Sequence, residues 1–270
     1  MPRKPTLSPT KISTYLACPT KFYWTYVDDR GRWYLRAKSY YSFGTTLHKV
    51  LERFHDGGDA GVTTISQALE SYEESWIDAG FSSSEEMQDA FGEGKQILER
   101  YFEETVKAPR FAKVFAVEER FKLPFGDDFD LVGRIDRIDE HEDGTLEIID
   151  YKTGREQVCP EDVESDLALG IYQLLVSAKY PDRNVKATIV ALKSGQSATH
   201  GMSSEERAVF QQDIETIGKV ILASNWEEKG VIPKWLCDNC DFRPLCCRDA
   251  EFGASLLTFQ ESNLGVSNHG

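Results

Sequence analysis

The sequence predicts an α/β protein with a central mixed β-sheet flanked by helices. Residues 133–139 and 146–152 alternate polar and apolar side chains and are rich in isoleucine, which is typical of strands. Helical patterns precede and follow them, at residues 42–55, 65–79, 85–107, 162–180 and 203–228. Because 40% of the 270 residues are hydrophobic, the chain can bury a core without disulfides.

The N-terminal part is predicted to be helical. Residues 7–24 begin with a Ser-Pro-Thr helix-entry signal and end in aromatic side chains, which indicates a helix packed by aromatics. In the next helix, over residues 42–55, His48 lies at the edge of an apolar stripe. A single histidine in that place is more often structural than a ligand. His55 is expected near the helix end, and the acidic helices over residues 57–110 carry no chemistry that we can identify.

The sheet and the C-terminal part follow. Residues 113–123 predict a strand that enters the sheet ahead of the hairpin described below. A helix over residues 162–180 and a strand over residues 185–192 come after the hairpin. The long helix over residues 203–228 then leads to a cysteine-rich segment, and the tail from Glu251 onward is expected to be poorly ordered.

Two carboxylates and a lysine occupy the predicted β-hairpin. Asp150 and Lys152 share one face of the strand over residues 146–152, because strand side chains repeat every two residues. Asp136 supplies a second carboxylate from the neighbouring strand. Such carboxylates can hold a hard divalent cation, and the ammonium can orient a water or stabilise charge on a phosphate. Asp139 and the acidic run after it are interpreted as a solvated turn.

The order of these residues is itself informative. Residues 133–139 read Gly-Arg-Ile-Asp-Arg-Ile-Asp, and residues 148–154 read Ile-Ile-Asp-Tyr-Lys-Thr-Gly. This resembles the RecB-type branch of the PD-(D/E)XK nuclease superfamily, whose pattern is G-x-I-D-x-x-D followed by I-x-D-Y-K-T/S-G. The resemblance implies a restriction-endonuclease-like core and metal-dependent hydrolysis of DNA.

The resemblance also implies which residues form the site. Residues 44–48 match the G-x-x-x-H helix of the family, whose histidine is a metal ligand, and His48 is assigned that role on this ground. Lys152 would position the hydrolytic water. The expected ligands of Mg²⁺ or Mn²⁺ are His48, Asp136, Asp150 and the backbone carbonyl of Tyr151.

Two positions depart from the family pattern. The glutamate of the family more often matches Glu118, whereas strand alternation favours Glu119, so neither is assigned to the site. The family has Q-x-x-x-Y on the helix after the catalytic strand, a pair implicated in binding DNA. Tyr172 fits the tyrosine, but Ala168 replaces the glutamine, and Gln173 lies about 100° around the helix.

The cysteines give a second signal. Cys237 and Cys240 are followed by Cys246, and Cys18 lies far upstream. Reduced cytosolic thiols favour a metal site over disulfides, and the spacing alone suits zinc as well as an iron-sulfur cluster. This arrangement of cysteines resembles that of the iron-sulfur subgroup of RecB-like nucleases, which includes the AddB nuclease domain and the CRISPR-associated adaptation nuclease. That resemblance implies a 4Fe-4S cluster that pins the terminal segments together, held by Cys18, Cys237, Cys240 and Cys246.

The other two cysteines are placed differently. Cys247 is adjacent to the fourth expected ligand and could compete for its role, whereas Cys159 is expected to be an ordinary free thiol. The expected layout is a single nuclease domain over residues 1–250 and a tail over 251–270. Within the domain we expect a helical part at 1–110, the catalytic sheet at 111–200, and a C-terminal helix with the cysteines at 201–250.

Charge and composition set limits on the partners. The formal net charge is −14, so the chain is expected to bind DNA weakly by itself and to rely on metal, a threaded single strand or a protein partner. The first six residues lack an apolar signal-peptide core, and no apolar run of 18 residues occurs, so we expect a cytoplasmic protein without a membrane segment.

The expected activity is that of a divalent-metal-dependent DNA exonuclease. It would act on single-stranded ends in DNA repair, recombination or processing, with a possible helicase or recombination partner. Two alternatives remain open. One is a catalytically weak DNA-binding or scaffolding subunit of a helicase-nuclease or CRISPR adaptation complex, motivated by the acidic charge and by Ala168. The other is a site-specific or structure-specific endonuclease.

Overall fold

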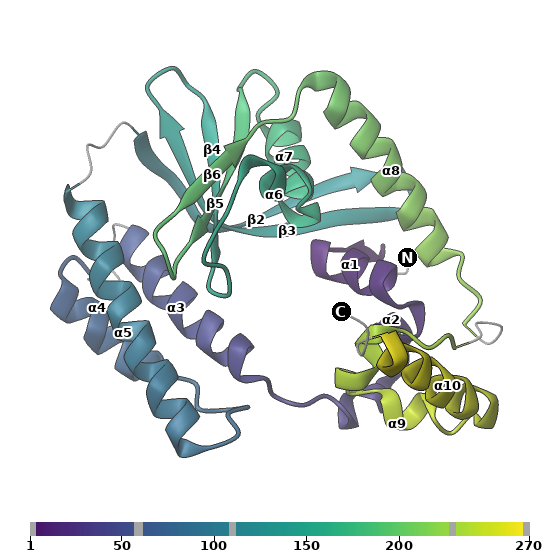
Figure 1. The fold of residues 1–270 in the computed structure, drawn as a ribbon. Helices are drawn as coiled ribbons and strands as arrows, with labels where there is room; N and C mark the ends of the chain where they lie inside the picture. The colour runs from purple at the N-terminus through teal and green to yellow at the C-terminus, as the bar shows by residue number, and fades with distance from the viewer. Residues whose placement is uncertain (1–3, 57–61, 108–111, 227–230, 267–270) are drawn as a thin grey trace. The chain divides into compact units, whose positions relative to one another are not determined.

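The computed structural model describes residues 4–56, 62–107, 112–226 and 231–266 (Figure 1). Its contacts divide the chain into two units. Unit 1 consists of Met1–Thr10 and Ala37–Lys219, and unit 2 consists of Lys11–Arg36 and Val220–Gly270. Among the described residues, every helix is too short or too polar to cross a bilayer.

Unit 1 is built on a six-stranded mixed sheet with the strand order β1-β3-β4-β5-β6, in which β2 also pairs with β3. Strands β2, β3 and β4 are antiparallel, β4 and β5 are parallel, and β6 is antiparallel to β5. The predicted α/β class with a central mixed sheet is therefore confirmed. The strands are β1 (Thr6–Leu7), β2 (Ala112–Phe125), β3 (Phe129–His141), β4 (Leu146–Lys152), β5 (Val185–Ala191) and β6 (Ser197–His200).

Three helices of unit 1 pack together and share an apolar core with the sheet: α3 (Ser39–His55), α4 (Ile65–Ser75) and α5 (Ser84–Lys107). Leu47 and Leu51 of α3 are fully buried in this core, where they join Ile149 and Tyr151 of β4. The helix α4 begins where Thr64 and Gln67 form a capping box. Because Ile149 and Tyr151 point into this core, Asp150 and Lys152 project from the other face of β4.

The helices α6 (Pro160–Glu164) and α7 (Leu167–Lys179) replace the single helix expected over residues 162–180. The break arises because the Asp166 carboxylate accepts hydrogen bonds from the backbone N–H groups of Ala168 and Leu169, which caps the start of α7. Helix α7 contacts strands β2 to β5. Gly133 of β3 allows this approach, because a Cβ atom there would lie 2.7 Å from Leu175 Cδ1.

Unit 2 joins the two ends of the chain through aromatic packing. Phe22 stacks on Trp226 with ring centroids 5.5 Å apart, and Tyr15 meets the same indole edge-on at 6.2 Å. Helix α8 (Ser204–Leu222) starts in unit 1 and ends in unit 2. The other elements are α1 (Pro9–Ala17), α2 (Pro19–Tyr26), the 3₁₀ helices η1 (Asp29–Trp33) and η2 (Trp235–Asn239), α9 (Arg243–Cys246) and α10 (Ala250–Val266).

Two expectations for the ends of the chain are wrong. The N-terminal helix is divided at Cys18, whose Sγ accepts a hydrogen bond from the Lys21 N–H and caps α2. The tail from Glu251, expected to be poorly ordered, instead continues α10 to Val266, and Phe252 and Leu256 lie one helical turn apart in it and are both buried against Cys237. Residues 267–270 of the predicted tail lie outside the described residues.

Candidate active site

Strands β2 and β3 bring two carboxylates together in unit 1. Asp136 lies in the middle of β3, and the register pairs Val117 with Arg137 and Glu119 with Ile135, so Glu118 lies opposite Asp136. Directly opposed residues of antiparallel strands have neighbouring side chains. His48 of α3 completes the group, and the ligand atoms of His48, Glu118 and Asp136 all lie within 4.8 Å of one another.

Glu118 is the carboxylate that strand alternation failed to identify. The pairing of β2 shifts by one residue between Val114 and Ala116, and Glu118 itself has a φ of 50°, in the left-handed region. Each irregularity interrupts the alternation of side chains between the two faces of β2, on which the choice of Glu119 rested. Glu119, which alternation favoured, instead forms an ion pair with Lys179. The signal that could have found Glu118 is the position of the family glutamate.

Hydrogen bonds tie His48 and Asp136 to the backbone of β4. His48 Nε2 lies 3.0 Å from the Tyr151 carbonyl oxygen, and His48 Nδ1 lies 3.3 Å from Asp136 Oδ2. The same Asp136 oxygen accepts a hydrogen bond of 3.0 Å from the Tyr151 N–H. Burial favours neutral His48, but Asp136, Asp150 and the Tyr151 carbonyl outweigh it and raise the pKa of His48 to about 9. The acceptors around His48 therefore favour a positive charge at this position, and a bound cation would take the place of the imidazole proton.

Asp150 and Lys152 lie beside this group at the end of β4. Lys152 Nζ is 2.8 Å from Asp150 Oδ2 and 3.5 Å from Asp166 Oδ2. Asp166, the cap of α7, is a second site neighbour that the sequence analysis missed. Burial and then the charge of Asp136 raise the pKa of Asp150 to about 6, although Lys152 opposes the shift. Asp150 Oδ2 is buried, and no donor among the described residues makes an aligned hydrogen bond to it.

This donor set fits a hard divalent cation. Carboxylates dominate it, with one imidazole and one carbonyl, and such oxygen-rich sets suit Mg²⁺ or Mn²⁺. Burial and the nearby Asp136 raise the pKa of Glu118, so the carboxylates repel one another when no cation is bound. Asp150 Oδ2 is buried and has an ion pair with Lys152 but no aligned hydrogen bond among the described residues, so the carboxylate keeps lone pairs that could bind a cation.

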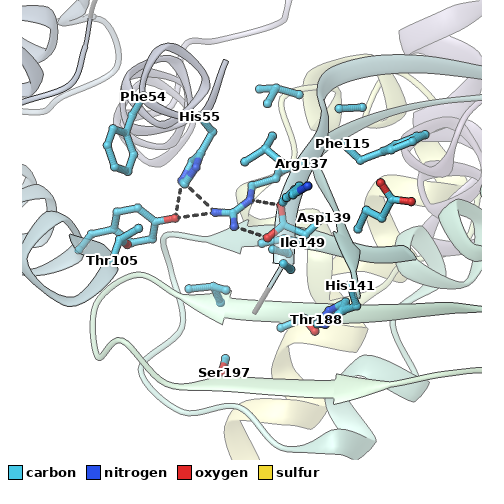
Figure 2. A pocket seen from close by; sticks show the side chains of 18 of the residues that line it. Phe54, His55, Thr105, Phe115, Arg137, Asp139, His141, Ile149, Thr188 and Ser197 are labelled. Carbon is cyan, nitrogen blue, oxygen red and sulfur yellow. Dashed lines mark hydrogen bonds and ion pairs between the residues drawn. The ribbon is translucent and has the colours of Figure 1, made fainter. Parts of the chain in front are cut away.

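A polar network of unit 1 lines a cavity of about 1400 Å³ (Figure 2). The Arg137 guanidinium holds the Asp139 carboxylate, with Nε 2.6 Å from Oδ1. Its Nη1 lies 3.0 Å from His55 Nε2, which is 2.7 Å from the Tyr101 hydroxyl, and this hydroxyl is 3.0 Å from that of Tyr151. Asp139 is only 5% exposed, so its interpretation as part of a solvated turn is wrong. The network holds the side chain of Tyr151, whose backbone carbonyl faces His48.

Comparison with known proteins identifies the family. The model of the PD-(D/E)XK nuclease superfamily matches residues 6–247. The chain belongs to this superfamily. One subunit of an ATP-dependent helicase/deoxyribonuclease from Carboxydothermus hydrogenoformans is 26% identical over 206 residues, which cover 64% of the chain but only 18% of that protein. The crystal structure of SSO0001 covers 75% of the chain and matches over 83% of its own length, at 15% identity and a TM-score of 0.31, which is too low to bear on the fold.

The residues expected from the Q-x-x-x-Y pattern lie on helix α7. Tyr172 of α7 lies against Gly133, and burial together with the charges of Asp150 and Asp136 raises its pKa, so its ring is close to the candidate site. Gln173 is buried and accepts a hydrogen bond of 2.9 Å from the Met202 N–H. Gln173 therefore has a structural role and does not replace the glutamine that is absent at position 168.

The four cysteines expected to bind a cluster all belong to unit 2. Burial and then the neighbouring thiols raise the pKa of Cys246 to about 12, and the same causes raise the pKa of Cys240. Cys246 packs against the buried cluster of Cys237, Phe252 and Leu256. None of the six cysteines forms a disulfide, and the exposed Cys159 belongs to unit 1, where it caps α6.

Proposed function

We propose that this chain is a divalent-metal-dependent deoxyribonuclease. The observation that carries the proposal is one constellation in unit 1. The ligand atoms of His48, Glu118 and Asp136 converge within 4.8 Å, next to an Asp150 carboxylate that has an ion-paired Lys152 beside it. Membership of the PD-(D/E)XK nuclease superfamily supports this reading.

In the proposed mechanism, Mg²⁺ or Mn²⁺ would be held by His48, Glu118, Asp136, Asp150 and the Tyr151 carbonyl. When bound, the ion lowers the pKa of a coordinated water and neutralises charge on the scissile phosphate. Burial lowers the pKa of Lys152, but Asp150 and Asp166 outweigh it and raise the pKa above the ordinary value, so the ammonium stays charged. That ammonium donates hydrogen bonds that orient the attacking water and stabilise the oxygen on which negative charge develops.

The substrate we propose is DNA with a single-stranded end, cleaved as an exonuclease in repair or recombination. Because the net charge is −14, the chain should attract DNA from solution only weakly, which favours a strand that a partner delivers to the site. The relative from C. hydrogenoformans is part of a helicase/deoxyribonuclease, and a helicase partner would supply such a strand. A catalytically weak, scaffolding role is the second candidate, favoured by Ala168 in place of the family glutamine.

We also propose that Cys18, Cys237, Cys240 and Cys246 hold a 4Fe-4S cluster. Partial burial, the packing of Cys246 against the Cys237 cluster and origin from two distant segments support this role, since a metal centre there would fix both ends of the chain in unit 2. Zinc could use the same four thiolates.

Digestion of end-labelled linear and circular single strands tests the activity. With Mg²⁺ or Mn²⁺ present, linear strands should be degraded and circular strands of the same sequence should resist. Lys152→Ala should abolish degradation, whereas Lys179→Ala, which removes a partly exposed lysine paired with Glu119, should not. Equal cleavage of circles would establish an endonuclease, and full activity in Lys152→Ala would exclude the proposed mechanism. No cleavage by the wild-type protein would favour the scaffolding role.

A further inference from the structure

Unit 2 contains a small aromatic cavity that the proposed chemistry does not use. Its volume is about 410 Å³, within the usual size of small-molecule sites. The walls come from both ends of the chain and combine three aromatic side chains, two guanidinium groups and one buried leucine. They are Trp24, Arg30, Trp33, Tyr34, Leu245 and Arg248.

The charge of the chain is divided unevenly between its two units. Unit 2 contains nine basic and nine acidic residues, so the net charge of −14 arises entirely from unit 1. Within unit 2, residues 11–36 contain five basic and two acidic residues. The cavity walls are built largely from this basic segment, in a protein that otherwise repels phosphate.

The two guanidinium groups in the walls differ in their partners. Arg30 is neutralised by Asp28, with Nε 2.9 Å from Oδ1, and its guanidinium lies 5.5 Å from the centre of the Trp24 ring. Arg248 donates a hydrogen bond of 2.7 Å to the neutral Tyr34 hydroxyl. Arg248 is exposed, and no carboxylate of the described residues forms an ion pair with it. Its charge is therefore available to an anion.

Trp33 is the most exposed ring of the cavity. Its side chain is 76% exposed at the end of η1, and the Arg32 guanidinium lies 5.0 Å from its ring centre. A flat, accessible ring beside cations suits a nucleobase attached to a phosphate. Bases in a duplex are already stacked on one another, so only a single strand offers a free face.

We propose that this cavity binds one nucleotide of single-stranded DNA, with the base stacked on Trp33 and the phosphate paired with Arg248. The inference rests on the proposed deoxyribonuclease function for its choice of DNA as the ligand. Stacking of this kind tolerates any base, because every base has an aromatic face. The cavity would add affinity without adding sequence specificity, which suits an enzyme that must accept any strand.

Binding of a fluorescent oligothymidylate, measured by anisotropy in Ca²⁺ and in the Lys152→Ala background to prevent cleavage, tests the proposal. Trp33→Ala should weaken binding roughly 5- to 150-fold, the range that one stacked base contributes. Trp33→Phe, which keeps an aromatic face, should restore most of the loss. Trp235→Ala is the matched control, because Trp235 is 82% exposed in the same unit but does not line the cavity, and its affinity should be unchanged.

Two further measurements separate stacking from charge. With an oligonucleotide of abasic sites, the wild-type and Trp33→Ala proteins should bind equally. Arg248→Gln should reduce the slope of log affinity against log salt by roughly 0.7, the value for one phosphate contact on a single strand, whereas Trp33→Ala should leave it unchanged. Unchanged affinity in both variants would overturn the cavity site while leaving the nuclease intact. Trp33-dependent binding without any wild-type cleavage would instead overturn the nuclease and keep the cavity site.

Discussion

The buried ion pair between Arg137 and Asp139 makes a quantitative prediction about stability. The Arg137 side chain is 15% exposed and that of Asp139 is 7% exposed, so both charges are largely removed from water. Burial lowers the pKa of Arg137, but the Asp139 carboxylate outweighs it and raises the pKa, so the guanidinium remains charged. Arg137→Met would keep most of the volume of the side chain and remove its charge and its five donors.

The expected cost of Arg137→Met is about 3–5 kcal/mol in the free energy of unfolding, because a buried carboxylate loses its partner. The double variant Arg137→Met/Asp139→Leu should recover most of that loss, since replacing both charges by apolar groups is often neutral. A control on the surface is Lys219→Met, which breaks an exposed pair with Glu215 and should cost less than about 1 kcal/mol.

Urea unfolding followed by far-ultraviolet circular dichroism measures these differences. The four proteins of the cycle (wild type, each single variant and the double variant) give the coupling energy between Arg137 and Asp139. A cost for Arg137→Met as small as that of Lys219→Met would show that the network is exposed to water in solution. A double variant that is less stable than either single variant would refute the reasoning that the unpaired charge causes the loss.

Three further predictions follow from single residues. Glu118→Gln should weaken Mn²⁺ binding at least roughly tenfold by calorimetry, whereas its neighbour Glu119→Gln should not, and equal affinities in the two variants would remove Glu118 from the site. Burial raises the pKa of Glu147, but Thr188, His141 and Lys186 outweigh burial and lower the pKa. Ionised Glu147 therefore stabilises the folded protein at pH values above about 4.3, the pKa of an unfolded glutamate, and this stabilisation is lost as the pH falls further. Glu147→Gln should therefore destabilise the protein to urea at pH 7 and less so at about pH 3, and a difference that does not shrink with acid would contradict this. Protein prepared without oxygen should be brown, with absorbance near ~400 nm and roughly four irons per chain. Cys18→Ser should lose the absorbance and the iron, whereas Cys159→Ser should keep both. Stoichiometric zinc in place of iron would overturn the cluster assignment.

The sequence was most informative where a single strand sets the geometry. Asp150 and Lys152 were placed side by side by the period of two alone, and the structure puts Lys152 Nζ 2.8 Å from Asp150 Oδ2. The same rule failed for Glu118, because a register shift and a left-handed residue in β2 are set by tertiary packing and leave no mark on the hydrophobic pattern. Glu118 was the only member of the cluster of His48, Glu118 and Asp136 that the sequence left unassigned.

Tertiary partners account for the other differences. Asp139 belongs to an acidic run, and its burial depends on Arg137, which is two residues away on the same strand face and could have suggested the pair. Phe252 and Leu256 pack against Cys237 of the cysteine segment, and the composition of residues 251–270 alone does not predict this contact. The sequence could bring Cys18 near Cys246 only through family resemblance, whereas the structure places both in unit 2. The extent of the single domain expected over residues 1–250 stays a prediction.

The most direct test of the proposed nuclease is the rate of Mn²⁺-dependent hydrolysis of a linear single strand by the wild-type, Asp150→Ala, Lys152→Ala and doubly substituted proteins. If Asp150 and Lys152 act as one metal-centred unit, each single variant should lose most of the activity and the double variant little more. Circular dichroism should show that all four proteins are folded. Wild-type rates in either single variant, or losses that simply multiply in the double variant, would contradict the assignment of this site.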